Sequence, residues 1–118
     1  CEIARGKSQT LYLGNTSIQR DWGWAPEYVD AMYRMLQQEE PDDYAIATGQ
    51  ANSLNDFVIA VFQYLGLNWE DHVQVDQSLY RPTDISLSCG NATKAHEKLG
   101  WKAKYDMRDV AQMMVDAV

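Results

Sequence analysis

The sequence predicts a mixed α/β fold, in which about four helices alternate with several short strands. Three observations carry this prediction. Apolar residues recur at helical spacing in segments 25–36, 54–65 and 107–118. Short runs of β-type residues lie between the helices and are bounded by turn residues. The chain has 118 residues and shows neither a repeat nor a linker, so one domain is expected over residues 1–118.

The first complete helix is predicted to start near Ala25. Pro26 suits the first helical turn, where its missing N–H costs nothing, and Glu27 suits the positive N-terminal end. The residues expected on its apolar face are Ala25, Tyr28, Val29, Met32, Met35 and Leu36.

Ser53 is predicted to cap the next helix, with Asp56 three residues later in capping-box spacing and Gly66 as the C-terminal stop. Towards the end of the chain, Asn91 is predicted to cap a helix over Ala92–Leu99, which Gly100 ends. Asp106 is predicted to cap the last helix. Its apolar face comprises Met107, Val110, Ala111, Met114 and Val118.

Short strands are predicted at Thr10–Leu13, at Tyr44–Gly49, which reads as buried, and at His72–Asp76. Tyr80–Asp84 is predicted to be a loop, because Pro82 prevents a regular helix and biases Arg81 towards extended geometry. Ile85–Cys89 reads as a short extended piece.

Charge and composition argue against several classes of protein. The net charge of −7 argues against general nucleic-acid binding, and no apolar run approaches the roughly 20 residues that span a bilayer. Two cysteines are too few for a disulfide scaffold and favour a reducing, cytoplasmic setting. No Cys or His pair has metal-ligand spacing, so no metal is expected.

No catalytic residue is predicted. The chain has neither a Gly-rich dinucleotide fingerprint nor a Tyr-x-x-x-Lys pair, and therefore no cofactor is expected on this chain. The remaining candidate chemistry is the recognition of anions. Arg20 precedes a Trp-Gly turn, Arg81 lies in a Pro-stiffened loop, and Asp84 can accept hydrogen bonds from sugar hydroxyls. On spacing alone, surface salt bridges explain these residues better than diphosphate binding does.

Eight blocks of the sequence resemble the GDP-mannose 4,6-dehydratase family, in family order and over nearly the whole chain. The Arg-Asp-Trp-Gly and Asp-Asp-Tyr-x-Ile-Ala-Thr-Gly blocks are specific to this branch. The Arg-x-x-Asp and Leu-Gly-Trp segments are shared with the wider extended short-chain dehydrogenase/reductase group. The blocks are Leu11–Asn15, Arg20–Gly23, Tyr28–Met32, Met35–Gln38, Pro41–Gly49, Tyr80–Asp84, Asn91–Ala95 and Lys98–Lys102.

The resemblance implies a small substrate-binding subdomain of an extended short-chain dehydrogenase/reductase, without the N-terminal Rossmann domain that holds NADP and the catalytic Tyr/Lys pair. It implies binding of GDP-mannose by a lyase that forms GDP-4-keto-6-deoxymannose for deoxysugar biosynthesis. By motif position, Arg20 and Arg81 resemble the phosphate contacts and Asp84 the ribose contact. Leu13 and Asn15 lie where the family's strand approaches the base.

The sequence departs from the family at Trp24, where His is common, which affects local packing and fine specificity. Glu2–Gly6 reads as the last turn of a helix, so a fragment of a longer chain is expected, with a cloning or proteolysis scar as the competing explanation. We expect this chain alone to be catalytically inactive and to expose an apolar interdomain face that permits self-association. The alternatives are a stand-alone nucleotide-sugar-binding protein and a module that only mediates oligomer contacts.

Overall fold

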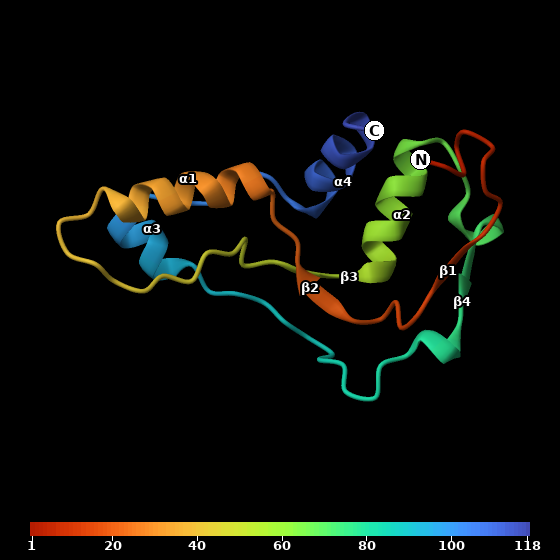
Figure 1. Ribbon diagram of the computed structural model, residues 1–118, viewed down its shortest axis with the longest axis horizontal. Helices are drawn as coiled ribbons and strands as arrows, with labels where there is room; N and C mark the ends of the chain where they lie inside the picture. The colour runs from red at the N-terminus through yellow and green to blue at the C-terminus, as the bar shows by residue number, and fades with distance from the viewer.

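The computed structural model describes residues 1–118 and confirms the mixed α/β prediction (Figure 1). Four α-helices and four three-residue strands occur, with two 3₁₀ turns at Trp69–Asp71 and Gln77–Leu79. In chain order the elements are β1 (Leu11–Leu13), β2 (Gln19–Asp21), α1 (Ala25–Leu36), β3 (Ala51–Ser53), α2 (Leu54–Tyr64), β4 (Val73–Val75), α3 (Thr93–Leu99) and α4 (Met107–Asp116).

The strands form two separate pairs. β1 runs parallel to β4, with Tyr12 opposite Gln74, and β2 runs antiparallel to β3, with Arg20 opposite Asn52. The predicted strands at 10–13 and 72–76 are thereby confirmed within one residue at each end. β2 and β3 were not predicted from the sequence, because Gln-Arg-Asp and Ala-Asn-Ser lack the β-branched and aromatic residues that signal a strand.

The prediction of a strand at Tyr44–Gly49 is wrong. Tyr44 and Ile46 do pack against the core and Ala47 is buried. However, residues 44–47 make no backbone–backbone hydrogen bond. A strand needs a neighbouring strand to take its N–H and C=O groups, and no other segment of these 118 residues supplies one.

The molecule has two small hydrophobic cores. In one, α1 packs on α3 through the cluster Ala31, Ala95, Leu99 and Trp101. In the other, α4 lies beside α2 (Figure 1), and their buried residues are Val58, Phe62, Met107, Val110 and Ala111. Met114 and Val118, which we predicted on the apolar face of the last helix, are exposed, and Val118 lies beyond the end of α4.

Capping boxes open two of the helices. The predicted Ser53–Asp56 capping box opens α2, and Asp106 opens α4 with Asp109 as its reciprocal partner. The predicted cap of α3 is wrong by one residue: Ala92 occupies the N-cap position. Asn91 Oδ1 still accepts hydrogen bonds from the backbone N–H (3.0 Å) and hydroxyl (2.6 Å) of Thr93.

The apolar face predicted for α1 is only partly buried. Ala31, Tyr28 and Met35 face α3, whereas Val29, Met32 and Leu36 lie in solvent. Glu2–Gly6 forms a hydrogen-bonded turn that ends at Gly6 with a positive φ, not an α-helix.

Candidate functional site

Arg20, at the middle of β2, joins this strand to a distant loop. Its Nη2 donates to Asp84 Oδ1 at 2.9 Å, and its Nη1 donates to the carbonyl of Ile85 at 2.6 Å and to that of Gln19 at 2.8 Å. Both members of the ion pair are partly exposed, with side-chain exposures of 30% and 24%. Since an arginine has five N–H donors, two donors of Arg20 remain free for another acceptor.

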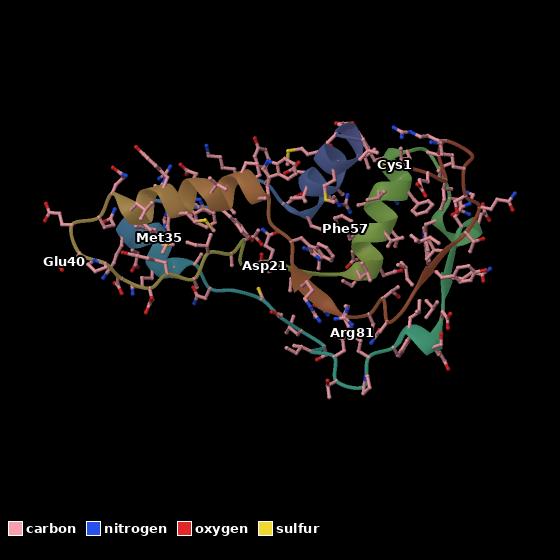
Figure 2. All side chains as sticks on the ribbon, in the orientation of Figure 1. Cys1, Asp21, Met35, Glu40, Phe57 and Arg81 are labelled. Atoms are coloured by element: carbon pink, nitrogen blue, oxygen red, sulfur yellow. The ribbon has the colours of Figure 1, made fainter.

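Arg81 lies three residues before Asp84, in the same loop, Tyr80–Asp84, which we call the Arg81 loop (Figure 2). Three residues of extended chain span at most about 11 Å, which limits the separation of the Arg81 and Asp84 backbones. The Arg81 residue is exposed, and its guanidinium has no hydrogen-bond or ion-pair partner in the chain. The structure therefore brings Arg20 and Asp84 into contact and leaves the Arg81 side chain exposed, without a hydrogen-bond or ion-pair partner.

Leu13 and Asn15 border the same region. The carbonyl of Leu13 accepts a 2.7 Å hydrogen bond from the N–H of Asp76, just before the turn that leads to the Arg81 loop. Asn15 Oδ1 accepts from the N–H of Ser17 at 2.9 Å and so closes the turn between β1 and β2. All five predicted residues thus lie on β1, β2 and the connected loops, but none lines the two hollows described below.

Asp21 is the residue that the sequence analysis missed. Its Oδ1 accepts from the N–H and hydroxyl of Thr48, at 2.9 and 2.6 Å. Its Oδ2 accepts from the N–H groups of Gly49 (2.9 Å) and Gly90 (3.3 Å). Partial burial acts to raise the pKa of Asp21, but the hydrogen bonds from Thr48, Gly49 and Gly90 outweigh it and hold the pKa below its ordinary value.

No signal in the sequence pointed to Asp21, because Gln19–Asp21 lacks the residues that are typical of a strand. Gly49 and Gly90 are suited to bring bare backbone N–H groups close to the Asp21 carboxylate. A Cβ at Gly90 would lie 2.2 Å from the Cβ of Ala47, so only glycine fits there.

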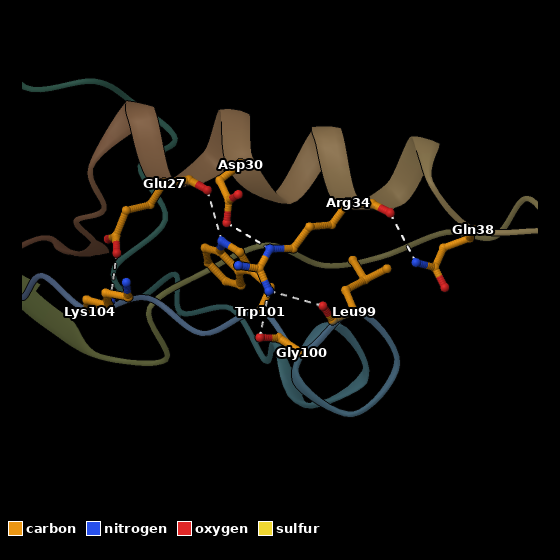
Figure 3. A network of polar contacts seen from close by, with 8 residues as sticks. All are labelled: Glu27, Asp30, Arg34, Gln38, Leu99, Gly100, Trp101 and Lys104. Carbon is orange, nitrogen blue, oxygen red and sulfur yellow. Dashed lines mark hydrogen bonds and ion pairs between the residues drawn. The ribbon is translucent and has the colours of Figure 1, made fainter.

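Two hollows lie around Trp101. One, of about 340 Å³, is lined by residues that include Thr48, Asn91 and His96. The other, of about 540 Å³, lies between α1 and the chain after α3. Figure 3 shows its polar contacts: the indole N–H of Trp101 donates to the carbonyl of Glu27 at 2.9 Å, and Arg34 donates to Asp30 and to the carbonyl of Gly100. These contacts pair polar groups in the walls of this hollow with one another, and they hold α1 on α3.

The predicted site residues include two permanently charged side chains, Arg20 and Arg81. No group of three His, Cys, Asp or Glu side chains is arranged to hold a metal ion. No helix has both the length and the apolar character needed to cross a membrane. Guanidinium groups at the surface bind phosphate oxygens well, because they are permanently charged and donate in pairs.

The fold is that of a portion of larger enzymes. RMD from Pseudomonas aeruginosa, solved with NADPH, matches with a TM-score of 0.84 at 16% identity, over 98% of this chain and 37% of that one. The dTDP-glucose 4,6-dehydratase of Bacillus anthracis, solved with NAD, matches with a TM-score of 0.83 at 19% identity, over 98% and 35%. These likenesses define the class: an extended short-chain dehydrogenase/reductase fold, represented here by about a third of its length.

Sequence similarity narrows the class to one family. The family model described as GDP-mannose 4,6 dehydratase matches residues 1–114, and the chain belongs to that family. It is 48% identical to GDP-mannose 4,6 dehydratase 1 of Arabidopsis thaliana over 97% of this chain and 32% of the relative. It is 38% identical to the human GDP-mannose 4,6 dehydratase over 98% and 36%. The chain thus spans about a third of the length of these curated relatives.

Proposed function

We propose that this chain is the substrate-binding portion of a GDP-mannose 4,6-dehydratase. Arg20 and Arg81 bind the two phosphates of GDP-mannose, and Asp84 binds the ribose. Leu13 and Asn15 border the base. The observation that carries the proposal is the contact between Arg20 on β2 and Asp84 on the Arg81 loop, which joins residues 64 positions apart.

The Arg20–Asp84 ion pair orients the guanidinium before substrate arrives. Holding the donors in place reduces the entropy lost when phosphate binds. The two free N–H groups of Arg20 and the unpartnered guanidinium of Arg81 then supply the charge. Such binding energy, applied away from the reacting carbons, positions the mannose for chemistry performed elsewhere.

In this proposal, the dehydratase reaction is carried out by residues other than these 118. The reaction oxidises C4 of the mannose, eliminates water across C5–C6 and returns the hydride to C6. The 118 residues contain no glycine-rich strand–turn–helix for NADP and no Tyr-x-x-x-Lys pair, so they do not fit the cofactor. We therefore attribute no chemical step to this chain, and expect it to be inactive alone.

A chimeric enzyme tests the proposal. The matching 114 residues of the Arabidopsis dehydratase 1 are replaced by this chain, and dehydratase activity is measured with GDP-mannose. In the active chimera, Arg20→Ala and Arg81→Ala should each raise KM about tenfold or more, since a hydrogen bond to a charged group contributes roughly 1.5–3 kcal/mol. Arg5→Ala in the N-terminal turn, whose guanidinium contacts the carbonyl of Val118, is the matched control and should leave KM unchanged.

The exposed apolar face of α1 favours a second candidate, an oligomerisation module. In that case both arginine variants of the chimera keep the original KM. Calorimetry with the isolated chain tests a third candidate, a stand-alone nucleotide-sugar-binding protein. Heat of binding on adding GDP-mannose supports this candidate. The absence of such heat supports a portion that binds the substrate only together with the rest of a dehydratase.

A further inference from the structure

Three consecutive residues of β2 hold one distant segment. Arg20 binds Asp84 and the carbonyl of Ile85. The N–H of Gln19 donates to the carbonyl of Ser86 at 2.8 Å, and its carbonyl accepts from the N–H of Ser88 at 3.0 Å. Asp21 accepts from the N–H of Gly90. Residues 84–90 are therefore attached to β2 at their beginning, middle and end.

The attachment at the end of the segment also holds a second part of the chain. The carboxylate of Asp21 accepts from Thr48 and Gly49 as well as from Gly90, so it ties two chain segments to β2 at one point. Hydrogen bonds to an ionised carboxylate are stronger than those between neutral groups. The close approach of Gly90 to Ala47 leaves the segment little room to shift.

We propose that Asp21 is a positioning residue for the Arg81 loop: by fixing Gly90 on β2, it sets the register in which Asp84, on that loop, contacts Arg20. This inference rests on the proposed function for its consequence in binding, but its structural content is independent of it. Asp21 itself touches no substrate. It acts through the segment that carries the other residues.

Hydrogen exchange in the 118-residue chain tests the register. Asp21→Asn keeps the shape of the side chain but presents an amide group to backbone donors that need an acceptor. The amides of Gln19 and Ser88, which Asp21 does not contact, should exchange about tenfold faster than in the original chain. The amide of Val58 in α2 should change much less, which separates a local release from global unfolding.

Two further variants make the result specific. Gly90→Ala keeps the carboxylate but forces the segment off β2, and should accelerate the same two amides. Asp106→Ala removes the cap of α4, which weakens the fold without touching β2, and should accelerate Gln19 and Ser88 no more than Val58. The proposal is overturned if Gln19 and Ser88 accelerate no more than Val58 in Asp21→Asn.

Kinetics of the chimeric dehydratase test the consequence for binding. With Asp21→Asn, KM for GDP-mannose should rise about tenfold while kcat changes far less, because the loop is misplaced but the reacting groups are not. An unchanged KM in an otherwise active chimera overturns the positioning role. If Arg20→Ala and Arg81→Ala leave KM unchanged, the proposed function fails, and the exchange experiment still decides whether Asp21 sets the register.

Discussion

Single charged residues decide where distant segments of this chain meet. On α3, Lys94 donates to Asp42 Oδ1 at 2.7 Å and Lys98 to Asp42 Oδ2 at 3.2 Å. The Lys94 ammonium also lies 5.1 Å from the ring centre of Tyr44. The hydrogen bond from Lys94, followed by those from the N–H of Asp43 and from Lys98, lowers the pKa of Asp42 to about 2. The acidic turn after α1 is thus attached to α3.

The pKa of Asp42 can be checked directly. Lys94→Ala should move it from about 2 towards the ordinary value of 3.8, as followed by NMR of the carboxyl carbon during an acid titration. Lys102→Ala, another lysine near α3 but without a contact to Asp42, should leave the titration unchanged. A folded-state pKa below the unfolded value stabilises the fold above about pH 4, and this contribution is lost as the pH falls towards 2.

At the scale of elements, helix ends were the most predictable features. Ser53 and Asp106 each accept a backbone N–H of the first turn, and the residue three positions later returns the contact. Gly66 and Gly100 end their helices with φ values of +69° and +62°. Each of these features depends on four or five neighbouring residues, so local sequence suffices to specify it.

Removing one cap should therefore have a local, measurable cost. Ser53→Ala should lower the free energy of unfolding by about 1 kcal/mol in urea titrations, because the N–H of Asp56 loses its acceptor. Ser86→Ala, whose hydroxyl makes no hydrogen bond in the structure, serves as the control and should change the stability by much less. Equal effects in the two variants would show that the cap contributes nothing.

The whole molecule is unusually open for its length. Its extents are 53 × 34 × 17 Å and its radius of gyration is 17.1 Å, against about 13.5 Å for a compact domain of this length. Only 10 residues are buried, and the accessible surface is 8183 Å², against roughly 6,500 Å² expected from the mass. On α1, Val29, Met32, Tyr33 and Leu36 form an apolar stripe with exposures between 59% and 81%.

An exposed apolar stripe of this kind should promote association. Sedimentation of the isolated chain should show a concentration-dependent rise above the monomer mass, and the double change Met32→Glu with Leu36→Glu should reduce it. Glu2→Gln with Lys7→Gln, a double change at an exposed turn, is the control and should leave association unchanged. A strict monomer at all concentrations contradicts this prediction.

The sequence by itself determined the mixed α/β class, the capped helices, two of the four strands and the family resemblance. All of these features depend on patterns of neighbouring residues or on short sequence motifs. It also pointed to Arg20, Arg81 and Asp84 as recognition residues, but spacing alone left salt bridging as the simpler explanation.

Only the tertiary structure decided which groups meet. It paired Arg20 with Asp84, disclosed Asp21 as the acceptor for two glycine amides, and left residues 44–47 without a partner strand. It also buried one side of α1 and exposed the other, although both sides are apolar. These outcomes depend on contacts between residues far apart in the chain, and local hydrophobic periodicity carries no information about which distant segment supplies the neighbour.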